Sequence, residues 1–222
     1  MAGIKQIKVQ RPEGGNTQDY WLLEALDNHL TVPQRPPRQG VFYPSSLGSK
    51  CDRFLYNSYF GLVQEETISP NTKRIFDCGD YLGYRYEKYF EKMGVLVSTE
   101  TPLKSDSPPL SGRLDFLIKH DQKQLAVIEL KSIGASGFKA LTKKPKDEHF
   151  IQLQIYLALT GHEYGVVLYE NKDNQKVKAF SVIKDDEVWK QLVDRCTKIM
   201  AMKEQPSVCT GLRYCPCKRE QQ

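Results

Sequence analysis

The sequence predicts an α/β protein in which a mixed central sheet is flanked by helices. The stretch 111–132 alternates apolar and polar residues on both sides of a polar cluster, which is typical of a β-hairpin. The stretch 164–183 repeats this pattern around a second polar turn. Segments with helical periodicity lie before and between these hairpins, and this order of elements indicates a sheet covered by helices.

Apolar periodicity and helix-breaking residues set the expected elements. Pro-rich residues 31–40 predict an extended linker, and the Gly- and Lys-rich loop 134–148 is expected to be mobile. Helices are expected at 19–30, 72–93 and 149–160. Another helix is expected to be capped by Ser45 or Ser46 and to run to about residue 60. A last helix is expected to open at Asp185 and Asp186 and to end near Lys203. A strand near 95–99 precedes the first hairpin.

The composition fits one globular domain with appendages. The chain has 222 residues, of which 40% are hydrophobic and 27% are charged. We expect residues 1–44 to form an arm with a short helix and linker, 45–217 a single domain, and 218–222 a tail. The apolar runs are too short to span a bilayer, and no signal peptide is evident, so we expect a cytoplasmic protein without a membrane partner.

One face of the first predicted hairpin carries three charged residues. If its turn centres on Gln122, Asp115 lies opposite Glu129, and Lys131 shares their face. Two carboxylates this close repel each other unless a cation lies between them, and Mg²⁺ suits such oxygen ligands. The alternative is an ion-pair cluster on a solvated strand. The same register predicts an apolar opposite face on which Leu114 pairs with Leu130, Phe116 with Ile128, and Ile118 with Ala126.

Asp115, a spacer of thirteen residues and then Glu129-Leu130-Lys131 resemble the PD-(D/E)XK nuclease superfamily. Gln152 and Tyr156 resemble the Gln-x-x-x-Tyr motif of its RecB-type branch, and the resemblance covers about residues 45–217. It implies a restriction-endonuclease-like core and a DNA nuclease that depends on Mg²⁺ or Mn²⁺. The implied substrate is single-stranded DNA or DNA with free ends, cut as by an exonuclease. The implied catalytic residues are Asp115, Glu129, Lys131, Gln152 and Tyr156.

The sequence departs from this branch at one metal ligand. The branch usually carries a His four residues after a helix Gly. Here Gly79 matches the glycine, and Gly83 stands in place of the His. Glu87 fits the acidic residue found further along and is expected to join Asp115 and Glu129 as a metal ligand. Asp80 or a water could also fill the position of the His. The alternative is that Glu87 is a solvated helix residue.

The cysteines suggest a second metal centre. Cys51 lies early in the chain, whereas Cys209, Cys215 and Cys217 fall within nine residues near its end. One early and three late cysteines resemble the iron–sulfur staple of the CRISPR-associated exonucleases in the RecB-type branch. Four thiolates suit a 4Fe–4S cluster or structural Zn²⁺, and the departure from the usual spacing leaves both open, beside plain reduced thiols. The other cysteines, Cys78 and Cys196, are expected in the core.

Basic residues next to the predicted site suit a DNA partner. Lys143, Lys144 and Lys146 precede the Gln152 helix, where they are expected to follow a phosphate backbone; a solvated Lys-rich loop is the alternative. Other functions also fit the sequence: a structure-specific DNA endonuclease, a non-catalytic DNA-binding subunit with the same fold, or a nuclease that acts on RNA. The sequence identifies no protein partner.

Overall fold

The computed structural model describes residues 20–33, 38–63, 67–119, 124–210, 215 and 217. Residues 1–19 of the expected arm, the hairpin turn at Gln122 and the tail 218–222 lie outside the described residues. The helices are α1 Tyr20–Leu30, α2 Pro44–Leu47, α3 Asp52–Phe60, α4 Pro70–Met93, α5 Ala135–Ala140, α6 Asp147–Thr160 and α7 Asp186–Met200. The strands are β1 Val32–Pro33, β2 Thr67–Ile68, β3 Leu96–Asp106, β4 Pro109–Lys119, β5 Leu125–Ile133, β6 Tyr164–Asn171 and β7 Val177–Ile183.

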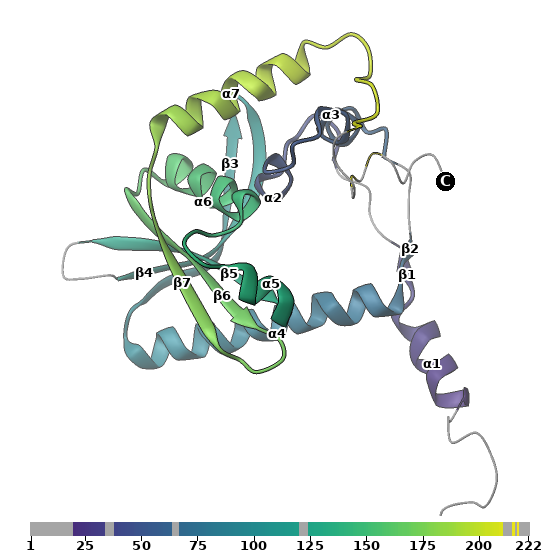
Figure 1. Cartoon of the computed structure of the whole chain (residues 1–222), viewed down its shortest axis with the longest axis vertical. Helices are drawn as coiled ribbons and strands as arrows, with labels where there is room; N and C mark the ends of the chain where they lie inside the picture. The colour runs from purple at the N-terminus through teal and green to yellow at the C-terminus, as the bar shows by residue number, and fades with distance from the viewer. Residues whose placement is uncertain are drawn as a thin grey trace, which may run out of the picture.

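A five-stranded mixed sheet with the order β3-β4-β5-β6-β7 forms the centre of the protein. All neighbouring pairs are antiparallel except β5 and β6, which are parallel. A parallel pair needs a crossover connection, and α5 and α6 supply it (Figure 1). The predicted mixed sheet flanked by helices is therefore confirmed.

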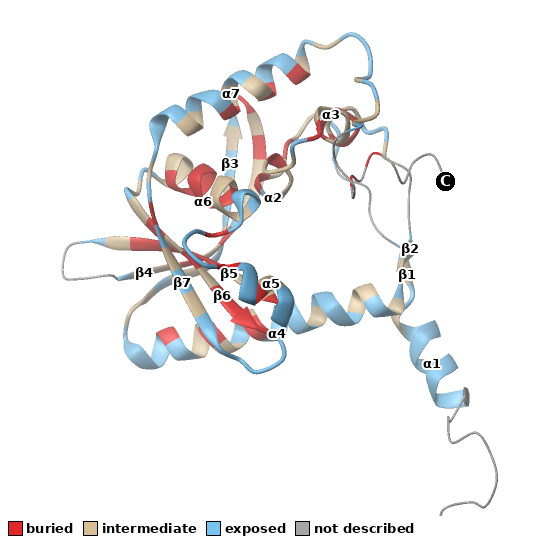
Figure 2. Cartoon of the chain, viewed as in Figure 1, coloured by how far each residue is buried: buried red, intermediate tan, exposed pale blue. Residues whose placement is uncertain are grey.

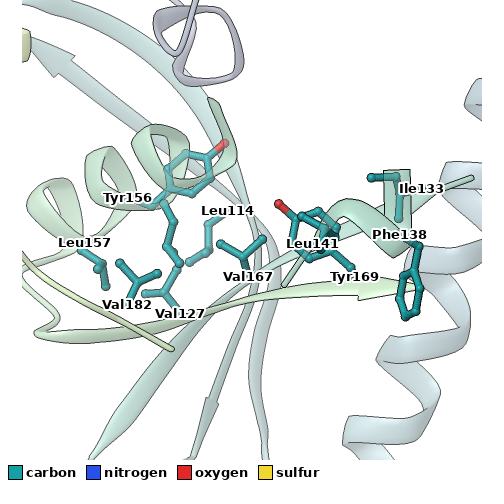
Figure 3. Packing of buried hydrophobic residues seen from close by; sticks show 11 residues of the cluster. Leu114, Val127, Ile133, Phe138, Leu141, Tyr156, Leu157, Val167, Tyr169 and Val182 are labelled. Carbon is teal, nitrogen blue, oxygen red and sulfur yellow. The ribbon is translucent and has the colours of Figure 1, made fainter. Parts of the chain in front are cut away.

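Helices cover both faces of this sheet. Val127 and Ile128 are consecutive in β5 and point to opposite faces. Val127 belongs to an apolar cluster with Leu153 and Leu157 of α6, whereas Ile128 belongs to a cluster with Phe90 and other residues of α4. Figure 2 shows the buried residues concentrated on the sheet and α6, and Figure 3 shows the packing on the α6 side. The two faces are called the α6 face and the α4 face below.

A further layer packs on the outer side of α6. Leu47 of α2, Leu55 of α3 and Ile199 of α7 share an apolar cluster with Ile155 of α6. Arg195 of α7 adds a salt bridge to Asp52 of α3, with 2.8 Å between Nη2 and Oδ1. This layer fixes the segment that carries Cys51 to the central sheet.

Strands β3 and β4 depart from regular alternation at the same point, which corrects one predicted pairing. Phe116 packs on the α4 face as expected, but Leu114 packs on the α6 face, so it does not pair with Leu130. On β3, Glu100 has a φ of 50° and lies between the partners of these two residues. The left-handed backbone marks an irregularity at which both strands switch faces.

Two other expectations about helices and loops are wrong. The helix expected from Ser45 or Ser46 to residue 60 is divided into α2 and α3. A Cβ added to Gly48 would lie 2.5 Å from Glu148 Cα, so the chain at this break passes close against the start of α6. The expected loop 134–148 contains the helix α5, and Lys178 Nζ donates to the carbonyl oxygens of Phe138 and Leu141 at 2.8 and 2.5 Å.

The strand predicted near 95–99 continues to Asp106 as β3, because it pairs with β4 along its length. The other long elements form close to their predicted bounds. Helix α4 ends at Gly94 and α6 at Gly161, and both glycines have the left-handed φ that commonly ends a helix. Asp185 caps α7 by accepting from the backbone N–H of Glu187 and Val188. The linker expected at 31–40 contributes β1, which pairs with β2. Within the described part of the chain, no helix is long and apolar enough to cross a bilayer.

Candidate active site and thiol cluster

Asp115 lies where β4 and β5 separate. The backbone pairing of these strands starts at Phe116 and Ile128. One residue earlier, Asp115 Oδ2 accepts a hydrogen bond from the backbone N–H of Leu130 at 2.8 Å. Burial raises the pKa of Asp115 to about 6, against the opposing effects of this hydrogen bond and of Lys131. The Asp115 side chain therefore accepts the hydrogen bond that a backbone carbonyl of β4 would accept in a regular sheet, and this bond holds its carboxylate beside β5.

Glu129 is a buried carboxylate that the protein satisfies incompletely. Its side chain is 0% exposed, and Lys131 Nζ lies 2.5 Å from its Oε1. Its Oε2 has no hydrogen-bond partner among the described residues. Burial, and then the charge of Asp115, raise the pKa of Glu129 to about 8 in spite of Lys131. The predicted grouping of two carboxylates and an ammonium is present, but it lies in a packed layer beneath α6 rather than on a solvated strand.

This burial makes the stability of the metal-free protein depend on pH. The pKa of Glu129 is about 8 in the folded protein against 4.5 for an ordinary glutamate, so the folded state binds more protons between these values. Stability then falls as pH rises through this range. We expect the melting temperature in EDTA to decrease from pH 5 to pH 8.5, and to decrease less in Glu129→Gln. If the melting temperatures of the two proteins decreased equally with pH, the raised pKa of Glu129 would be contradicted.

Glu100 is a site residue that sequence reasoning missed. Its charge raises the pKa of both Asp115 and Glu129. It forms an ion pair with Arg113, whose own charge lowers the pKa of Asp115. No periodicity or motif marks Glu100, because its position follows from the irregularity that it shares with β4.

Gln152 and Tyr156 lie together on α6, as their spacing predicts. Both are buried, and Gln152 Nε2 donates to Tyr156 Oη at 3.1 Å. Burial and the charge of Glu129 raise the pKa of Tyr156, so its hydroxyl stays protonated beside the carboxylates. Gln154 points elsewhere: its amide donates to the Ile183 carbonyl at 2.8 Å and accepts from the Asp185 N–H at 2.9 Å. Gln154 therefore connects α6 to the start of α7.

A cavity of about 1040 Å³ lies beside the charged group, which it meets at Lys131. Lys131 and Gln152 line it, and so do Lys144 and Lys146. These last two lysines also pair with Asp147 and Glu148, at 2.9 and 3.4 Å. Lys143 lines a separate cavity of about 580 Å³, so the structure places two of the three predicted lysines at the candidate site.

The structure does not bring Glu87 into this group. Helix α4 packs on the α4 face, against Phe116 and Ile128, whereas Glu129 continues the α6-facing series of Val127. The carboxylate of Glu87 lies 3.5 Å from Lys88 Nζ. A Cβ added to Gly83 would meet nothing within 4 Å. The ligand role of Glu87 stays a prediction, and Glu100 is the additional carboxylate whose charge reaches Asp115 and Glu129.

Four cysteines meet at one point. The sulfur atoms of Cys51, Cys209, Cys215 and Cys217 all lie within 4.8 Å of one another. Cys215 Sγ and Cys217 Sγ are 3.1 Å apart, and Cys209 Sγ and Cys217 Sγ are 3.4 Å apart. Cys51, at the N-terminus of α3, also accepts from the backbone N–H of Phe54 at 3.4 Å. Four converging sulfur atoms fit a tetrahedral metal or an iron–sulfur cluster.

The other cysteines differ from each other. Cys196 is buried among α3, α6 and α7, as predicted. Cys78 is exposed, which corrects the expectation that it is a core residue. Helix α4 buries only Leu82, Tyr86 and Phe90, and all three lie in its second half. Cys78 precedes this half and faces solvent.

Comparisons with known proteins connect this geometry to a nuclease-like fold. No family model matches the chain, and neither does any curated protein. The crystal structure of SSO0001 is similar with a TM-score of 0.54 and 21% identity, over 85% of this chain and 87% of that one. The alkaline exonuclease LHK-Exo from Laribacter hongkongensis is similar with a TM-score of 0.56 and 15% identity, over 80% and 91%. Its complex with dAMP matches with a TM-score of 0.53 and 16% identity, over 73% and 87%. The chain thus shares the mixed α/β fold of an alkaline exonuclease, consistent with the PD-(D/E)XK resemblance.

Proposed function

We propose that this chain is a DNA nuclease that depends on Mg²⁺ or Mn²⁺ and acts as an exonuclease on single-stranded DNA or DNA ends. Residues 45–217 form its nuclease domain. Lys131 and Gln152, two of the residues that resemble the motifs of such nucleases, line one cavity, and the fold is shared with an alkaline exonuclease. A non-catalytic DNA-binding subunit would not require a buried carboxylate pair next to a lysine.

The observation that carries this proposal is the incomplete pairing of Glu129. A buried carboxylate is costly unless it is paired and hydrogen-bonded. Here one ammonium faces two carboxylates, and Glu129 Oε2 has no partner among the described residues. A hard divalent cation takes carboxylate oxygen ligands and would offset this charge, so the residues fit the metal. Asp115 and Glu129 would hold it.

The protein groups around the cation have separate tasks. When bound, the cation supplies an activated water and offsets charge on the phosphate. Lys131 places an ammonium beside the reacting phosphate, where negative charge develops. Tyr156 keeps its proton and holds the Gln152 amide, which fixes a donor at the cavity wall. Lys144 and Lys146 attract the phosphate backbone of the DNA next to the cleaved bond.

The cysteine cluster is proposed to hold a 4Fe–4S cluster or Zn²⁺ beside this site. Its support is the convergence of the four sulfur atoms. Cys215 also lines the cavity that contains Lys131 and Gln152. The metal centre would therefore fix one wall of the substrate cavity.

The test of the proposed function is cleavage of labelled DNA by protein purified without oxygen. We expect degradation of linear single-stranded DNA with Mg²⁺ or Mn²⁺, none in EDTA, and little cleavage of closed circles. Cleavage of circles at the same rate as linear strands would favour the endonuclease alternative. The cleavage rate on an RNA strand of matched sequence measures the preference for deoxyribose over ribose. Metal-independent cleavage, or no cleavage with either ion, would refute the proposal.

A further inference from the structure

His149 and Tyr169 form a hydrogen-bonded pair next to the candidate site. His149 Nδ1 lies 2.7 Å from Tyr169 Oη, and the backbone N–H of Lys146 donates to the same oxygen at 3.0 Å. Tyr169 is fully buried in β6, on the α6 face of the sheet (Figure 3). His149 lines the 1040 Å³ cavity together with Lys131 and Gln152.

This pair fixes the position of the imidazole proton. The N–H of Lys146 already donates to Tyr169 Oη, so this oxygen acts as an acceptor there. The hydroxyl hydrogen of the buried tyrosine needs its own acceptor, and His149 Nδ1 is at the right distance. If Nδ1 carried the proton instead, it would donate to Oη, and that hydroxyl hydrogen would be buried without an acceptor among the described residues. The neutral imidazole therefore carries its proton on Nε2.

The Nε2–H group remains available for a ligand. Among the described residues, the charged group near this nitrogen is the carboxylate of Glu148, whose Oε1 lies 3.6 Å away, too far for a hydrogen bond. The His149 side chain is 17% exposed, at the wall of a cavity that Lys131, Lys144 and Lys146 also line. A neutral donor among ammonium groups suits an anionic ligand with several acceptor oxygens, as in a phosphodiester.

We propose that His149 binds the substrate strand: Tyr169 holds its imidazole in the tautomer whose Nε2–H donates to a backbone phosphate oxygen in the cavity. This inference rests on the proposed function, because the phosphate belongs to the nucleic acid that the nuclease cuts. Burial, and then the charges of Lys131 and Lys146, lower the pKa of His149 to about 3, so the ring stays neutral at physiological pH. His149 is a donor of a hydrogen bond here, and Tyr169 is the positioning residue.

Two substitutions of His149 test the contributions of its two ring nitrogen atoms separately. The amide nitrogen of glutamine can take the place of Nε2, whereas asparagine reaches only the position of Nδ1. We expect His149→Asn to raise the Kd for a short fluorescent single strand in EDTA by about 10- to 100-fold, the usual effect of losing a hydrogen bond to a charged group. His149→Gln should stay within about threefold of the unmodified protein. In Mg²⁺, the asparagine variant should show a raised KM with little change in kcat.

Tyr169→Phe tests the positioning role. Without the hydroxyl, the ring can move its proton to Nδ1 and present an acceptor to the phosphate, so binding should weaken as in His149→Asn. The same change in a His149→Gln background should add nothing, because the amide donor does not depend on the tautomer. On a strand with uncharged methylphosphonate linkages, the His149→Asn and His149→Gln variants should have equal Kd values.

These measurements distinguish failure of the inference from failure of the proposed function. If the unmodified protein cleaves DNA but the Asn and Gln variants bind equally, His149 does not donate to the strand and the inference is wrong. A difference that persists on the methylphosphonate strand also overturns it, because the contact is then not with a phosphate. If the unmodified protein neither binds nor cleaves DNA, the proposed function itself is refuted.

Discussion

Replacing Asp115 with Asn or Glu129 with Gln should abolish cleavage in Mg²⁺ or Mn²⁺, with a loss on the order of a thousandfold or more. Both carboxylates would hold one cation, so each variant loses the same chemistry. The double variant should be hardly worse than either single one. Initial rates on linear single-stranded DNA measure the effect.

Stability measurements separate this loss of activity from misfolding. Glu129→Gln removes a charge that is buried and incompletely paired, so the melting temperature in EDTA at pH 8 should not fall. Glu163→Gln makes the same chemical change at an exposed carboxylate, which pairs with Lys184, and should leave the cleavage rate unchanged. Near-normal rates in Asp115→Asn or Glu129→Gln would contradict the assignment of the metal ligands.

Replacing Cys215 with Ser should release bound iron or zinc and lower the melting temperature by about 10 °C or more. The cysteine cluster joins α3 to the end of the chain, so the energy of metal binding is also energy of folding. Metal analysis and thermal unfolding of protein purified without oxygen measure both effects. Some cleavage should survive at low temperature, because Asp115 and Glu129 are not changed.

Two other cysteines provide matched controls. Cys78→Ser changes an exposed thiol and should alter neither the metal content nor the melting temperature. Cys196→Ser buries a hydroxyl in the cluster between α3 and α7 and should lower the melting temperature without releasing metal. Unmodified protein that contains neither iron nor zinc would show that the four thiols are ordinary cysteines.

The sequence predictions were accurate where an element depends on residues close to it in the sequence, and inaccurate where it depends on packing between distant segments. Helices α4, α6 and α7 end or begin at residues whose effect is local: Gly94, Gly161 and Asp185. Period-two alternation likewise predicted that β4 pairs with β5 through Phe116 and Ile128. Long-range packing has no such local signal. The division between α2 and α3 depends on the close approach of Gly48 to Glu148, so the sequence predicted one continuous helix there.

The candidate site shows the same division. Its residue types and their spacing were readable: Asp115, Glu129 and Lys131 lie near one another, and Gln152 lies on the helix above them. The burial of Glu129 could not be predicted, because it depends on α6, a later segment that packs over this face of β5. Glu100 was missed for a related reason, since its place beside Asp115 arises from an irregularity that two strands share.

The sequence by itself determined the kinds of groups that this protein presents: carboxylates with a lysine, a glutamine and tyrosine on one helix face, and one early with three late cysteines. Only the tertiary structure decided their surroundings. It buries Glu129 and leaves its Oε2 without a hydrogen-bond partner among the described residues, places Tyr169 Oη 2.7 Å from His149 Nδ1, and brings the sulfur atom of Cys51 together with those of the three late cysteines. The physical reason is that identity and spacing are local properties of the chain, whereas desolvation and hydrogen-bond partners are supplied by distant segments that pack against it.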